Sequence, residues 1–82
     1  MMHEAGIVRD LIEAFLDRVK NKQDINRVKK IYLKMGDSLG ITEEALRFWF
    51  ENLSKGTGLE NVSLEVFLVK GREIIIDSYE AD

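Results

Sequence analysis

Hydrophobic residues recur with two different periods along this chain of 82 residues, and this pattern constrains the fold more than any other feature. Between residues 7 and 19, apolar side chains return every three or four positions, as they do on one face of an amphipathic helix. From about Val28 the period becomes two, because Ile31, Leu33 and Met35 alternate with polar residues. This spacing predicts a strand with one solvated face.

The next segment has the signals of a second helix. Thr42 can accept a hydrogen bond from an unpaired backbone N–H, and the two glutamates directly after it suit the positive end of a helix dipole. Ile41 and Leu46 are spaced to pack on each other across this N-cap, and Gly56 is typical of a helix end. The sequence therefore predicts a helix that begins after Thr42 and ends before Gly56.

Two β-rich segments follow this second helix. Apolar and polar residues alternate over residues 62–68, and residues 74–76 are three isoleucines in a run that favours a strand. The glycine of the intervening Lys70-Gly71 pair permits a tight turn. We therefore expect these last two strands to pair as a hairpin.

Together these elements predict an α+β fold in the order helix, strand, helix, strand, strand. The second helix connects the first two strands, by a right-handed crossover if those strands are parallel. Each helix has one apolar stripe, so both are expected to pack on one face of a mixed three-stranded sheet. A chain of this length can build one modest core, and residues 1–82 are predicted to form a single α/β domain.

Composition excludes several classes of function. The chain has no cysteine, so it can form neither a disulfide framework nor a structural zinc site of the usual sulfur-rich kind. Its 12 Lys and Arg against 15 Asp and Glu give a net charge of -3, whereas nucleic-acid-binding domains usually carry a basic excess. No segment has the pattern of a secretory signal or the length of a membrane span. We expect a cytoplasmic protein that binds neither nucleic acid nor membrane.

No constellation of residues points to catalysis. His3 is the single histidine, and no serine has a base near it in the sequence. The stretch from Gly36 to Gly40 precedes a helix but lacks the Gly-Lys-Ser/Thr ending of a phosphate-binding loop, and we interpret it as a turn. The chain is therefore not expected to be an enzyme.

Two surface features have an ordinary structural interpretation. The lysines of residues 29–34 are expected to keep the sheet soluble and to protect an edge strand, rather than to bind a polyanion. Three consecutive aromatic residues in the second helix cannot all face the core. We expect Trp49 and Phe50 to pack inside, and Phe48 to be exposed for a contact with another chain.

His3 is the strongest candidate for a functional residue. Its imidazole is a good nitrogen donor for a borderline transition metal and lies within reach of the free α-amine. With Met1 retained, the amine, two intervening backbone amides and the imidazole can close three chelate rings in one plane. This geometry suits Ni(II) or Cu(II), and the ligands alone leave the metal open because copper binds such nitrogen sites more tightly. The alternative interpretation is that His3 is an ordinary frayed terminal residue.

Four segments also share their residues and their order with a known family. These segments are Met2-His3-Glu4, Arg27-Val28 through Met35-Gly36-Asp37, Ala45-Leu46-Arg47-Phe48 through Lys55-Gly56-Thr57, and Val69-Lys70-Gly71-Arg72-Glu73. Together they resemble the HypA/HybF family of nickel-insertion accessory proteins for nickel–iron hydrogenase. The resemblance implies a nickel-binding α/β domain that acts as a metallochaperone.

This chain departs from the family pattern in two ways. Family members carry a zinc domain with paired Cys-x-x-Cys motifs between their last two strands, and that insert is missing near residues 69–71. The family begins Met-His-Glu, and this chain has one methionine more. If Met1 is removed, the family arrangement returns, in which the terminal amine, the imidazole and backbone amides bind nickel. The expected metal ligands are therefore Met1, Met2, His3 and Glu4, the last through its backbone amide. Ni(II) is the expected metal, and no structural zinc is expected.

The resemblance further implies two partners, a companion nickel-delivery GTPase and the hydrogenase large-subunit precursor. The alternative function is a metal-free protein-protein adaptor derived from the same family. A chain that lacks the zinc insert could dock on another protein through its sheet or through Phe48.

Overall fold

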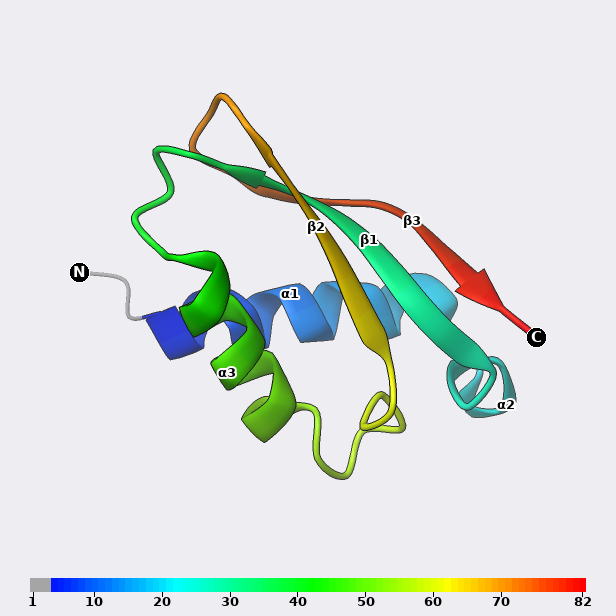
Figure 1. Cartoon of the computed structure of the whole chain (residues 1–82). Helices are drawn as coiled ribbons and strands as arrows, with labels where there is room; N and C mark the ends of the chain where they lie inside the picture. Colours follow the sequence, from blue (N-terminus) through cyan, green and yellow to red (C-terminus); the bar gives the residue numbers. More distant parts are fainter. Residues whose placement is uncertain (1–3) are drawn as a thin grey trace.

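Strand β1 (Val28–Gly36) lies at the centre of the sheet (Figure 1). The structure is a computed structural model that describes residues 4–82. Strand β2 (Ser63–Val69) pairs with β1 in parallel, and β3 (Ile74–Ala81) pairs with it antiparallel, so the strand order is β2-β1-β3. The predicted mixed three-stranded sheet is confirmed.

Both long helices lie on one face of this sheet (Figure 1). Helix α1 (Glu4–Val19) and helix α3 (Glu43–Leu53) contact each other. Thr42 is the N-cap of α3, and its side-chain oxygen accepts a hydrogen bond from the backbone N–H of Ala45 at 3.1 Å. The predicted α+β class and the order helix, strand, helix, strand, strand are confirmed. Within residues 4–82, neither helix is long and apolar enough to cross a membrane.

A short helix, α2 (Lys22–Ile25), occupies the polar segment in which no regular structure was expected. Its N-cap is Asn21, whose side-chain oxygen accepts a hydrogen bond from the Gln23 N–H at 2.9 Å. Ile25 is buried, and a Cβ placed on Gly58 would lie 2.9 Å from the Ile25 Cγ2 atom. The helix therefore packs against the loop that follows α3. Hydrophobic periodicity could not reveal it, because only one residue of the turn is apolar.

The core fills the space between the sheet and the two long helices. Its large side chains that are almost completely buried are Val8, Phe15, Ile31, Leu33, Met35, Leu46 and Leu59. Burial of each such side chain stabilises the fold by about 1.5–3 kcal/mol. Phe15 on α1 also packs edge-to-face on Tyr79 of β3, with ring centroids 5.2 Å apart. The apolar stripe of α1 and the alternating residues of β1 thus meet as predicted.

The predicted hairpin between the last two strands is wrong. β2 and β3 lie on opposite sides of β1 and do not pair with each other. The two flanking strands stand two strand spacings apart, roughly 9.6 Å. Residues 70–73 join them by crossing the end of β1, and four residues can reach up to about 14 Å. Residues 70–73 are therefore long enough to connect β2 to β3 with β1 between them.

The link crosses β1 so closely that Gly36 cannot carry a side chain. A Cβ on Gly36 would overlap the carbonyl group of Gly71. The Gly36 N–H donates a hydrogen bond to the carbonyl oxygen of Glu73 at 2.8 Å, and the Ser38 N–H donates to that of Gly71 at 2.8 Å. The Gly71 N–H in turn donates to the Asp37 carboxylate at 3.2 Å. The glycine-containing stretch after β1 is thus a turn, as predicted, and it holds the link in place.

Candidate metal centre

The structure describes only one of the four predicted metal ligands. Met1, Met2 and His3 lie outside the described residues, which begin at Glu4. Their role as ligands therefore stays a prediction. Glu4 is the first residue of α1, and its side chain is exposed.

The position of Glu4 suits the backbone ligand that was predicted there. The first N–H groups of an α-helix have no acceptor within the helix. A metal that displaces the proton of the Glu4 amide would therefore break no helical hydrogen bond. The positive end of the helix dipole repels a bare cation, but it stabilises the anionic amides that such a chelate contains.

Residues 4–82 contain no other arrangement that fits a metal ion. No three histidine, aspartate or glutamate side chains gather closely enough among them to hold one. Several carboxylates pair instead with basic side chains, as Glu43 does with Arg47 at 3.0 Å and Asp82 with Lys29 at 2.8 Å. In this part of the chain several of the acidic side chains therefore serve local ion pairs.

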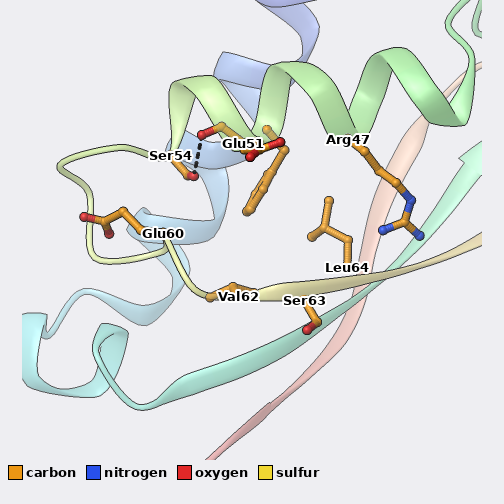
Figure 2. Close-up of a pocket in the computed structure, with 8 residues that line it drawn as sticks. Arg47, Glu51, Ser54, Glu60, Val62, Ser63 and Leu64 are labelled. Atoms are coloured by element: carbon orange, nitrogen blue, oxygen red, sulfur yellow. Dashed lines mark hydrogen bonds between the residues drawn. The ribbon is translucent and has the colours of Figure 1, made fainter.

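A hollow of about 490 Å³ lies between α3 and the start of β2 (Figure 2). Figure 2 shows the side chains of Arg47, Glu51 and Ser54 on one side of it and those of Glu60 and Ser63 on the other. The Ser54 hydroxyl is buried and donates to the backbone oxygen of Glu51 at 3.4 Å, so its partner is not a base. The lining therefore shows no activated nucleophile.

Glu60 organises the loop beside this hollow. Its carboxylate accepts hydrogen bonds from the backbone N–H groups of Gly56 at 3.1 Å and Gly58 at 2.7 Å. Hydrogen bonds from the Glu60 backbone and then from those of Gly56 and Gly58 lower the pKa of this carboxyl group. This role of Glu60 was not predicted from the sequence. Two glycines just before a glutamate are the signal that could have indicated it, because glycine readily adopts the positive φ angles of 81° and 97° found at Gly56 and Gly58, whose own N–H groups bind the carboxylate.

The lysines of β1 do not protect an edge strand, and that part of the prediction is wrong. β1 is the central strand, and its lysines reach across to both neighbours. Lys30 pairs with Glu65 of β2 at 3.6 Å, and Lys34 pairs with Asp77 of β3 at 3.5 Å. These lysines were predicted to lie on an edge strand because strand order cannot be inferred from the local alternation of apolar and polar residues.

The predicted burial of Trp49 and Phe50 and the predicted exposure of Phe48 are confirmed, whereas a contact of Phe48 with another chain stays a prediction. Phe50 is buried and Trp49 is partly buried against the core, whereas Phe48 is 56% exposed. The Phe48 and Trp49 rings pack edge-to-face with their centroids 5.1 Å apart. Phe48 therefore presents an apolar surface on the helical layer.

Comparison with known proteins identifies relatives over most of the chain. Residues 2–74 match a family model described as hydrogenase/urease nickel incorporation, metallochaperone, hypA. The chain is 38% identical to the hydrogenase maturation factor HypA of Methylocella silvestris over 71 residues, which cover 85% of this chain and 61% of that relative. It is 32% identical to the hydrogenase maturation factor HypA of Beijerinckia indica over 79 residues, which cover 96% of this chain and 69% of the relative.

The chain thus spans 61% to 69% of the length of these two relatives. This difference in length fits the missing zinc insert that was predicted from the sequence. The fold is similar to the solution structure of the Ni metallochaperone HypA from Helicobacter pylori, with a TM-score of 0.68 and 15% identity. The superposition covers 94% of this chain and 72% of that one. At this level of identity the likeness concerns the fold alone.

Proposed function

The chain belongs to the HypA family, and from this premise we propose that it is a nickel metallochaperone module that binds Ni(II) at its N-terminus. The observation that carries the proposal is the extent of the family match. It begins at Met2 and so includes His3 and Glu4, the residues that sequence reasoning had assigned to the metal.

The proposed ligands are nitrogen atoms at the start of the chain. With Met1 present they are the α-amine, the amides of Met2 and His3, and the His3 imidazole. With Met1 removed, the amine belongs to Met2 and the amide of Glu4 becomes a ligand. The first-turn position of Glu4 supports the second arrangement, because its N–H has no acceptor within the helix. Both arrangements give a planar nitrogen set that suits Ni(II).

Delivery of the metal is a separate part of the proposal. We infer that the acceptors are the companion nickel-delivery GTPase and the hydrogenase large-subunit precursor. The names of the relatives, which are hydrogenase maturation factors, support this inference. Because the chain spans only part of their length, binding and delivery are to be measured separately.

Calorimetric titration of the chain with Ni(II) tests the binding step. The expected result is one nickel per chain, with heat lost in a His3→Ala variant, since His3 is the single histidine. Glu4→Gln is the matched control. It changes the side chain and keeps the backbone amide, so it should bind as the unmodified chain does. Equal binding by the His3→Ala variant would overturn the assignment, and loss of binding in Glu4→Gln would move the site to the carboxylate.

A metal-free adaptor is the second candidate function, and the exposure of Phe48 favours it. In this case the chain would bind the GTPase through its helical layer without nickel. Binding of the purified GTPase by the His3→Ala variant and by the unmodified chain, each in the presence of a chelator, distinguishes the two functions. Equal binding that is lost in a Phe48→Glu variant would support the adaptor.

A further inference from the structure

The two edges of the sheet are protected to different degrees. β3 forms one edge, and two register shifts interrupt its pairing with β1. Such irregularities, together with charged side chains such as Asp77 and Glu80, hinder the addition of a further strand. β2 forms the other edge, and its register with β1 runs without a shift over seven residues. β2 also contains no proline and no lysine. The side of β2 that faces away from β1, the free edge of β2, therefore lacks the features that usually block strand addition.

Apolar side chains flank the free edge of β2 on both faces of the sheet. Phe67 is 51% exposed, and its neighbour Leu68 is 68% exposed. Successive residues of a strand point to opposite faces, so Leu68 lies on the helical face and Phe67 on the other face. An added strand would contact both side chains. The backbone N–H and C=O groups of an edge strand pair with another extended backbone, so the edge itself defines the shape of its ligand.

The hollow between α3 and the start of β2 lies beside this edge (Figure 2). α1 packs near β3, where Phe15 contacts Tyr79, whereas α3 faces β2 across the hollow. Leu64 lines the hollow and points to the helical face. A strand added to the free edge would lie about 4.8 Å from β2, and its side chain opposite Leu64 would point to the same face. That side chain is the one that can enter the hollow.

The charges around the hollow favour a cationic side chain. Arg47 is already paired with Glu43 at 3.0 Å, and Glu60 accepts hydrogen bonds from its own loop. Among residues 4–82, no basic side chain reaches ion-pair distance of the Glu51 carboxylate. The apolar part of the lining consists of Phe50, Val62 and Leu64. A lysine or arginine fits this site, because its aliphatic stem can contact the apolar lining while its charged end pairs with Glu51.

We propose that the free edge of β2 binds an extended segment of another protein, which adds to the sheet as a fourth strand and places one basic side chain in the hollow beside Glu51. The added strand runs antiparallel to β2, because this pairing is slightly more stable per residue than the parallel one. Its residues opposite Val66 and Leu68 are apolar. Its backbone hydrogen bonds supply affinity, and its side chains supply specificity. This surface goes beyond the proposed nickel site and uses none of its residues.

Charge argues against a second copy of this chain as the added strand. Antiparallel pairing of two copies along the whole of β2 would bring Leu68 of one copy opposite Leu64 of the other. β2 contains no lysine or arginine, and neither does β3. Neither edge strand can therefore supply the cation for Glu51. The partner is thus a different protein that carries a basic residue in an extended segment.

An NMR titration of the isotope-labelled chain with a synthetic peptide tests the proposal. The probe is Thr-Leu-Thr-Val-Thr-Lys-Thr with blocked ends, which matches the length of β2 and places its lysine opposite Leu64 in antiparallel pairing. The amide signals of β2 and of residues 47–54 should shift on binding, and those of β3 should not. A peptide with glutamate in place of the lysine should bind about three- to tenfold more weakly.

Two variants of α3 form a matched pair for the same titration. Glu51→Gln removes the charge beside the hollow and should weaken binding of the lysine peptide about three- to tenfold. Glu44→Gln changes an exposed glutamate about two turns earlier on the same helix and should leave the affinity unchanged. Equal affinity of the lysine and glutamate peptides, or equal effects of the two variants, would overturn the assignment of the basic side chain.

N-methylation of the peptide tests the strand pairing itself. Two versions are methylated at alternate residues in opposite phase, so that only one of them loses its hydrogen bonds to β2. That version should fail to bind, and the other should bind. Equal binding of both overturns the proposal, as does the absence of any shift in β2 at about 1 mM peptide. Shifts of β2 that grow with the concentration of the chain alone would assign the edge to a second copy and overturn it as well.

Discussion

Gly36 and Gly71 meet backbone to backbone where the connection between β2 and β3 crosses the end of β1. A Cβ on Gly36 would overlap the Gly71 carbonyl group and lie 2.8 Å from the backbone nitrogen of Arg72. The family resemblance places the zinc insert of longer members near residues 69–71. In this chain residues 70–73 alone connect β2 to β3. Because Gly36 has no side chain, this short link can cross the end of β1 at the Gly71 carbonyl group.

A side chain at Gly36 should therefore be costly. Gly36→Ala is expected to destabilise the fold by about 1–3 kcal/mol, because the obstacle is backbone that cannot rotate away. Gly6→Ala is the control. Its nearest neighbour would be the end of the Arg9 side chain at 3.9 Å, and alanine in a helix should be neutral or stabilising by up to about 1 kcal/mol. Urea denaturation measures both, and an unchanged midpoint for Gly36→Ala would contradict the proposed crossing.

Much of the local structure was predictable from the sequence. The stripe that begins at Ile7 gave α1, the alternation around Leu33 gave β1, and the N-cap at Thr42 marked the start of α3. These signals are local, because each depends on residues a few positions apart. Strand pairing is not local. The two β-rich segments on either side of Gly71 could pair directly as a hairpin or lie on opposite sides of another strand. The position of β1 between them decides for the second arrangement.

The candidate site was predictable to a different degree. A lone histidine near the first residue of the given sequence is visible without a structure, and the family match includes it. The position of Glu4 in the first turn of α1 could be established only from the structure, because the first residue of a helix is poorly defined in a sequence without an evident N-cap. The exposure of Phe67 and Ile75 also could not be predicted, because it follows from which strands flank β1.

Acid should weaken the loop that Glu60 holds. The folded state lowers the pKa of this carboxyl group below its ordinary value of 4.5, so its contribution to stability is present above that value. The contribution is lost as the pH falls through the lowered pKa. The free energy of unfolding should therefore fall less steeply in Glu60→Gln than in the unmodified chain as the pH is lowered below about 4.5. Denaturant titrations at each pH measure this free energy. If it depends on pH equally in the Glu60→Gln variant and in the unmodified chain, this role of Glu60 is contradicted.

Nickel affinity should depend steeply on pH, because the proposed chelate displaces protons from backbone amides. Each displaced amide proton changes the affinity about tenfold per pH unit, so two amides give about 100-fold per unit. Protonation of the α-amine and of the imidazole competes with the metal as well and adds to this dependence. The affinity should fall as the pH is lowered from about 8 to about 6. A site formed by the imidazole alone would change by at most about tenfold per unit. Competition titrations against a chelator of known proton affinity separate the two cases.

The central claim is that a free terminal amine and the His3 imidazole bind nickel together. Native mass spectrometry of the chain with one equivalent of Ni(II), before and after selective acetylation of the α-amine, tests it most directly. The proposed chelate predicts one nickel per unmodified chain and none on the acetylated chain. Equal nickel loading of both forms would contradict it.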